Sequence, residues 1–197
     1  IIGLYHFILF LQRRDDQNSL AFAMLCAAIA TRQSITSGII DSLKLSNGLE
    51  SYIWIMRVEY MSIPLCMMTG MYYLHLIYPN SKLMPFIKYW GIGIGSALIG
   101  FTCLTSSQTF STYVNLYVLY LLGCLIILII GVFIAVVNKK ELSRWMFGSV
   151  VVVALGGIND ILFAKQILDF GYLISYCFII FILIQSAIIS RRLLTIS

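Results

Sequence analysis

The feature that most constrains this chain is a series of seven apolar stretches separated by short polar gaps. Of its 197 residues, 60% are hydrophobic and only 11% are charged. A soluble domain needs many more polar side chains on its surface, whereas a helix of about 20 apolar residues crosses a bilayer. The stretches lie at 1–11, 19–36, 52–77, 87–104, 114–137, 145–163 and 170–189. The sequence therefore predicts an all-α membrane protein, with one seven-transmembrane helix bundle over residues 1–197.

Lysine and arginine fall mainly in alternate gaps between these stretches. Nine of the thirteen lie in or beside the first, third and fifth gaps or after the last stretch: Arg13, Arg14, Lys82, Lys88, Lys139, Lys140, Arg144, Arg191 and Arg192. Because short cytoplasmic loops retain basic residues during insertion, these gaps are predicted to be cytoplasmic. The N-terminus is then outside and the C-terminus cytoplasmic. The net charge of +5 is explained by this topology, and no basic–aromatic pattern indicates nucleic-acid binding.

The first stretch is too short to span a membrane by itself. Its eleven residues would form a helix of about 16 Å, about half the thickness of the hydrocarbon core. The chain also begins without an initiator Met. We therefore expect that the first transmembrane helix is truncated and that residues 1–197 are a fragment of a longer chain.

Four charged residues lie within the apolar stretches, namely Arg32, Arg57, Glu59 and Asp160. A charge in hydrocarbon is unfavourable unless it is paired or hydrated. At 1.5 Å per residue, all four fall in the outer third of the bilayer. We predict that they form an outer polar cluster in which the arginines pair with the acids and Asn159 adds hydrogen bonds. Two interpretations stay open: an ion-pair lock that only holds the bundle, or a pocket that also senses a ligand or signal.

Small residues in the fourth stretch favour close helix packing. Gly91 and Gly95 form a G-x-x-x-G pair, and Ser96 and Gly100 repeat the spacing with serine as the first small residue. Small residues let helices approach each other closely in lipid. Packing within the bundle is the first interpretation, and a homodimer interface is the second. Pro64 in the third stretch is predicted to kink its helix.

Enzyme chemistry is not indicated by the distribution of catalytic residue types. His6 and His75 lie in the inner half of their stretches, whereas the acidic residues lie in the outer third, so a Ser-His-Asp arrangement is excluded. No catalytic residue, metal or cofactor is therefore predicted. Haem or a metal held between the two histidines is a remote alternative. A transporter or small-solute channel that uses the outer polar cluster as its entrance is the main rival to a receptor.

Several short motifs recur in the order and spacing of one known family. They are Gly3-Leu4-Tyr5-His6, Gln12-Arg13-Arg14-Asp15, Ile158-Asn159-Asp160-Ile161-Leu162-Phe163, Gly171-Tyr172, Gln185-Ser186 and Ser190-Arg191-Arg192. With these motifs the chain resembles the bacterial seven-transmembrane receptors with diverse intracellular signalling modules. The likeness covers nearly all 197 residues.

The resemblance implies a sensor domain of the bacterial inner membrane that has no catalytic activity of its own. In that family an extracytoplasmic ligand-binding domain usually precedes the seven helices. A cytoplasmic output module usually follows, such as a histidine kinase, diguanylate cyclase, adenylate cyclase or phosphatase. The partners implied are the lipid bilayer and these two domains of the same chain. The last helix would then continue through Arg191-Arg192-Leu193-Leu194 toward the output module.

Overall fold

The computed structural model describes residues 1–37, 49–79, 83–140, 142–169 and 171–196. The side chains at 49–51, 83–88, 164 and 192–196 lie outside this description. Three of the basic residues used to predict the topology, Lys82, Lys88 and Arg192, are therefore not among the described side chains. The regular secondary structure of the described residues is entirely helical, which confirms the all-α prediction.

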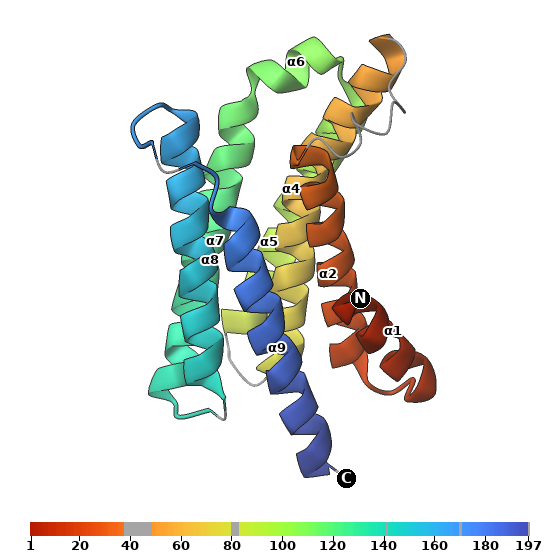
Figure 1. Ribbon diagram of the computed structural model, residues 1–197, viewed down its shortest axis with the longest axis vertical. Coiled ribbons are helices and arrows are strands. Elements are labelled where there is room, and N and C mark those ends of the chain that lie inside the picture. The colour runs from red at the N-terminus through yellow and green to blue at the C-terminus, as the bar shows by residue number, and fades with distance from the viewer. Residues whose placement is uncertain (38–48, 80–82, 141, 170, 197) are drawn as a thin grey trace. The chain divides into compact units, whose positions relative to one another are not determined.

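Every predicted apolar stretch corresponds to a helix (Figure 1). The helices are α1 (Ile2–Gln12), α2 (Gln17–Thr36), α4 (Leu49–Ile77), α5 (Leu83–Leu104), α6 (Ser107–Thr112), α7 (Val114–Val137), α8 (Ser143–Ala164) and α9 (Ile174–Ile196). The short helix α6 was not predicted. Its N-cap residue, Ser106, accepts a hydrogen bond from the Thr109 amide through its side chain, a usual way to begin a helix.

Four of the described helices are long and apolar enough to cross a membrane by length and composition. They cover Gln17–Thr36, Val114–Val137, Ser143–Phe163 and Ile174–Arg191. Shorter apolar helices run over Ile2–Gln12 and Tyr89–Leu104. The count of seven spans and the orientation of the termini stay predictions.

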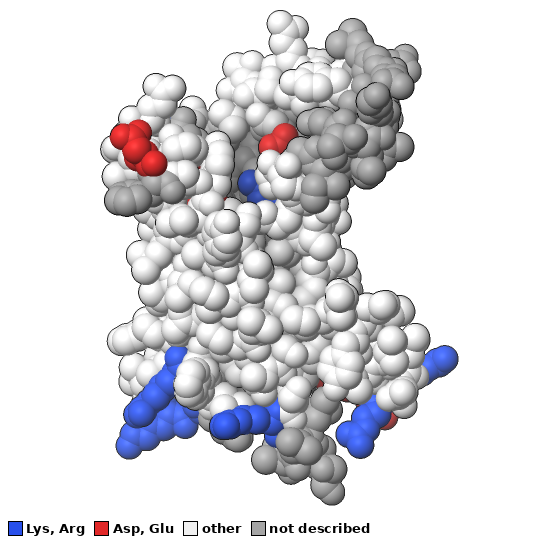
Figure 2. Space-filling view, viewed as in Figure 1, with Lys and Arg blue, Asp and Glu red and all other residues white. Residues whose placement is uncertain are grey.

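The chain divides into two compact units, Gly3–Cys124 and Leu125–Ser197, with the boundary inside α7. We call them the N-terminal unit and the C-terminal unit and describe each by itself. In the N-terminal unit, α4 packs against α2 and α5. In the C-terminal unit, α8 packs against α9. Figure 2 shows few charged side chains along the sides of the helices on the face viewed, as expected for surfaces that contact lipid.

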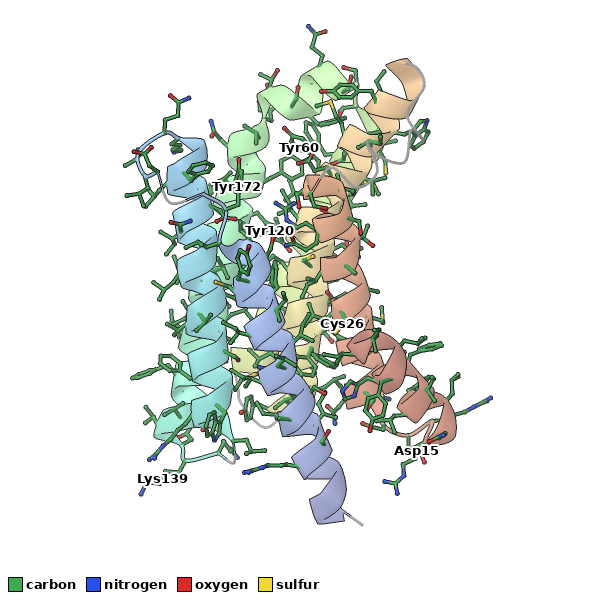
Figure 3. All side chains as sticks on the ribbon, in the orientation of Figure 1. Asp15, Cys26, Tyr60, Tyr120, Lys139 and Tyr172 are labelled. Atoms are coloured by element: carbon green, nitrogen blue, oxygen red, sulfur yellow. The ribbon has the colours of Figure 1, made fainter. Side chains whose placement is uncertain are left out.

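The turn between α1 and α2 shows how polar residues end one helix and begin the next. The Asp16 carboxylate accepts hydrogen bonds from the Ser19 amide (3.3 Å) and the Ser19 hydroxyl (2.5 Å), which closes the N-terminus of α2. His6 on α1 is fully buried, and its ring stacks edge-on against Phe22 at 4.8 Å between centroids. Asp15 marks this turn in Figure 3.

The predicted packing glycines of α5 differ in their surroundings. A Cβ atom on Gly91 would overlap the Met71 sulfur of α4, and one on Gly95 would lie 2.6 Å from Met68 Cγ. An added Cβ at Gly100 would meet no atom within 4 Å, and Ser96 is exposed. We propose that Gly91 and Gly95 allow α5 to pack closely on α4. Packing at Ser96 and Gly100, and a homodimer, stay predictions.

Pro64 lies buried near the middle of α4, which continues as one helix on both sides of it. Proline has no amide hydrogen, so the carbonyl of Tyr60 loses its usual partner four residues later. The kink predicted for this helix stays a prediction.

Candidate functional site

The five residues of the predicted outer polar cluster are divided between the two units. Arg32, Arg57 and Glu59 belong to the N-terminal unit, on α2 and α4. Asn159 and Asp160 belong to the C-terminal unit, on α8. Each group forms a site of its own, and a pairing of charges between the groups stays a prediction.

Arg57 belongs to α4, but its guanidinium group lies at the C-terminal end of α5. Its Nη1 donates to the carbonyl oxygens of Thr102 (3.1 Å) and Cys103 (2.8 Å), and its Nη2 donates to that of Thr105 (2.9 Å). The last carbonyl groups of a helix have no partner within the helix and carry partial negative charge. A guanidinium has several fixed donors, so one side chain satisfies two carbonyl groups of the last turn and that of Thr105, just after the helix.

Aromatic rings surround the same guanidinium. The Arg57 Cζ atom lies 5.7 Å from the ring centroid of Trp54 and 5.9 Å from that of Phe110. Both distances fall within the range of cation–π attraction. Phe110 comes from α6 and is fully buried. We call Arg57, these two rings and the three carbonyl groups the α5 cap.

Aromatic and hydroxyl groups of α4, α5 and α7 pack next to the α5 cap. The ring of Tyr60 packs against Phe110 (5.0 Å between centroids) and Tyr117 (5.1 Å). The Tyr117 hydroxyl is hydrogen-bonded to the Thr102 hydroxyl at 2.6 Å, and both residues are fully buried. The position of Arg57 is therefore tied to α4, α5, α6 and α7. Tyr60 is labelled beside this site in Figure 3.

Arg32 and Glu59 are joined through a serine. Arg32 Nη1 donates to the Ser62 hydroxyl at 3.4 Å, and that hydroxyl donates to the Glu59 main-chain carbonyl at 2.5 Å. The contact connects α2 to α4 without using the Glu59 carboxylate. A salt bridge from that carboxylate to an arginine stays a prediction.

Asp160 lies at the N-terminus of α9, although it belongs to α8. Its Oδ1 accepts hydrogen bonds from the amides of Leu173 (2.8 Å) and Ile174 (3.4 Å). The first amides of a helix have no partner within the helix, and a carboxylate there is stabilised by their partial positive charge. Asp160 therefore acts as an N-cap supplied by a neighbouring helix.

Asn159 fixes the turn that leads into α9. Its Nδ2 donates to the Gly171 carbonyl at 2.8 Å and to Asp160 Oδ1 at 3.3 Å. Gly171 has a φ of +72°, a conformation that glycine adopts without strain. We call Asn159, Asp160 and the turn groups they bind the α9 cap. Tyr172, labelled in Figure 3, marks this turn, and Lys139 lies at the opposite end of the same unit.

Sequence reasoning missed two contacts between α8 and α9. Gln185 Nε2 donates to the Ser149 hydroxyl at 2.6 Å, and both side chains are fully buried. Gly156 lies so close to α9 that an added Cβ would be 2.6 Å from the Cys177 sulfur. The neighbouring pair Gly156-Gly157 was a usable signal, because small residues mark close helix contacts in membranes.

Taken together, the fold and these sites define a class: an all-helical, multi-pass membrane protein that closes helix ends with charges from neighbouring helices. The family model described as "7TM diverse intracellular signalling" matches residues 1–192. Because the match covers nearly the whole chain, the chain belongs to this family, which the sequence motifs predicted. Comparison with curated proteins and with solved structures gave no further match. The chain is thus a transmembrane sensor domain linked to intracellular signalling.

Proposed function

We propose that this domain receives a signal on the outer side of the bacterial inner membrane and relays it to a cytoplasmic module that follows α9. An extracytoplasmic ligand-binding domain on the same chain would supply the signal. Any catalytic activity would belong to the cytoplasmic module. The family assignment supports this proposal, as does the apolar character of the helices.

The observation that carries the proposal is the α9 cap. Asp160 and Asn159 bind the turn directly before α9, and α9 then runs as one helix from Ile174 to Ile196. A helix of 23 residues is about 35 Å long, enough to cross the hydrocarbon core and continue beyond it. Arg191 near its end is typical of a cytoplasmic boundary. A displacement of the turn would therefore move the start of a helix whose other end is at the output side.

Relay through α9 requires two arrangements of the bundle that differ in their affinity for the stimulus. The α9 cap can pass such a change on, because Asn159 and Asp160 attach the start of α9 to α8. The buried hydrogen bond from Gln185 to Ser149 holds the same two helices together deeper in the domain.

The test uses the full-length protein in native membrane vesicles and the activity of its cytoplasmic module. Phosphate transfer from ATP and cyclic-nucleotide synthesis are both assayed, normalised to inserted protein. Asp160→Asn keeps the size of the side chain but removes its charge, and we expect it to change the basal output. Asp169→Asn is the matched control, since Asp169 is exposed in the segment that connects α8 to α9. Equal output from wild type and both variants, at equal insertion, would refute the proposed relay.

A further inference from the structure

Helices α8 and α9 contact each other through specific groups at three levels. At the outer level Asp160 binds the amides of Leu173 and Ile174. At the middle level the backbone of Gly156 lies against Cys177, where an added Cβ would be 3.1 Å from the Cys177 Cβ. At the third level the Ser149 hydroxyl accepts a hydrogen bond from Gln185.

All three levels require the same register between the two antiparallel helices. Ser149 and Asp160 are eleven residues apart on α8, and Ile174 and Gln185 are eleven residues apart on α9. In a helix this spacing corresponds to about 16 Å. The polar contacts at the outer and third levels are therefore separated by the same distance on both helices, so that one alignment of the helices satisfies both.

Sliding α9 along α8 by one turn, about 5.4 Å, would break every level at once. The Asp160 carboxylate would lose the amides at the start of α9, and the buried hydrogen bond from Gln185 to Ser149 would break. Loss of hydrogen bonds between buried groups is unfavourable in lipid as in a protein core. Cys177 would also be replaced beside Gly156 by Leu173 or Phe181, both of which are larger.

We infer that α8 and α9 move as one rigid hairpin of fixed register, and that α9 does not slide along α8 during signalling. The inference rests on the proposed function for its role in signal relay. A signal that reaches α9 then moves α8 with it, and the change of conformation occurs where the hairpin meets the rest of the protein. Ser149, Gly156, Asp160 and Gln185 act as positioning residues for this hairpin.

The register is tested by disulfide formation in membranes that contain the full-length protein. Gly156→Cys creates a partner for the native Cys177, and small adjustments bring the two Cβ atoms into the usual range for a disulfide. After mild oxidation, we expect mass spectrometry to find a peptide that links α8 to α9. Two variants shifted by one turn, Gly156→Cys/Cys177→Ser/Phe181→Cys and Gly156→Cys/Cys177→Ser/Leu173→Cys, should form no such link. Comparable linking in either shifted variant would overturn the fixed register.

A second pair covers the case in which Gly156→Cys prevents insertion. Ser149→Cys/Gln185→Cys should be bridged by a short bifunctional thiol reagent much faster than Ser149→Cys/Ile189→Cys. Equal rates for the two pairs would also overturn the fixed register.

The functional arm compares the output of the Gly156→Cys protein before and after oxidation. A rigid hairpin keeps its output when the disulfide joins its helices, whereas loss of output on oxidation and its return on reduction would show that sliding is needed. Gly156→Cys/Cys177→Ser is the control for oxidation elsewhere. Because cross-linking needs neither stimulus nor output, a correct register in a protein whose output ignores Asp160→Asn would count against the proposed function and leave the fixed register standing.

Discussion

Two helix ends in this protein are closed by a charge that comes from another helix, and the two charges have opposite signs. In the N-terminal unit, Arg57 of α4 binds the carbonyl groups at the C-terminus of α5. In the C-terminal unit, Asp160 of α8 binds the amides at the N-terminus of α9. Each sign matches the partial charge of the helix end that it meets. A charge within an apolar helix can therefore be accommodated without an oppositely charged side chain.

The two caps differ in how firmly they are held. Arg57 makes three hydrogen bonds and lies beside two aromatic rings, with Phe110 fully buried. Asp160 accepts hydrogen bonds from the amides of Leu173 and Ile174 and from the Asn159 side chain, and Asn159 also holds the turn at Gly171. The α5 cap thus resembles a permanent joint between helices. The α9 cap joins only α8 and the turn that leads into α9.

The largest effect is expected from Arg57→Ala, which leaves three carbonyl groups without their donor. We expect a loss of about 3 kcal/mol in the free energy of unfolding, because hydrogen bonds to charged groups are strong and their loss leaves polar groups unsatisfied. Unfolding of the purified domain in detergent would be followed by circular dichroism. Arg57→Lys should recover only part of the loss, since an ammonium group cannot reach all three carbonyls in the same geometry. Full recovery by lysine would mean that charge alone matters at this cap.

Asp160→Ala is expected to have the next largest effect, about 2 kcal/mol in the same measurement, typical of a lost N-cap with a charged acceptor. Asp169→Ala provides the control, because Asp169 is exposed in the segment that connects α8 to α9. Its effect should stay within about 0.5 kcal/mol, as for most surface changes. If Asp160→Ala proved as harmful as Arg57→Ala, the contrast between a firm and a weak cap would be wrong.

The helices and the charges at the two caps could be read from the sequence, but the partners of those charges could not. Apolar stretches predicted every long helix, because a bilayer allows few other structures. The same reasoning placed the start of the last helix at 170, whereas α9 begins at Ile174. Gly171, Tyr172 and Leu173 lie outside the helix, in a turn that Asn159 and Asp160 of α8 bind.

The partners of the two charges show the limit of sequence reasoning more clearly. Arg57 and Asp160 stand out because ionised side chains are rare in apolar helices. Apart from the neighbouring Asn159, the hydrogen-bond partners described for them are main-chain carbonyls and amides, which no side-chain pattern reveals. One of the rings beside Arg57, Phe110, comes from α6, whose six residues are too few to show a helical period. A search for helix ends near each charge would have been the more useful signal.

Asn159→Ala sharpens the comparison by weakening the α9 cap without touching its charge. We expect a loss of about 1 kcal/mol, chiefly from the 2.8 Å hydrogen bond to the Gly171 carbonyl, since the second hydrogen bond, to Asp160, is longer at 3.3 Å. Hydrogen exchange should become faster at the amides of Leu173 and Ile174, because the turn that presents them to Asp160 is released. Asn115→Ala, at the start of α7, is a control of the same chemistry. Unchanged exchange at both amides would show that Asp160 holds the turn without help from Asn159.

The smallest effect is expected from Trp54→Leu, which removes one ring from the α5 cap. Trp54 is 66% exposed, and cation–π contacts at exposed sites contribute about 0.5–1 kcal/mol. Tyr52→Leu is the matched control, since Tyr52 is 57% exposed and lies on the same end of α4. Aromatic residues also favour the membrane interface, and that preference would make the two variants equally harmful. The contact with Arg57 predicts a different result. Trp54→Leu should lower the free energy of unfolding in the wild-type protein but hardly change it in Arg57→Ala, because the ring of Trp54 then has no guanidinium group to contact.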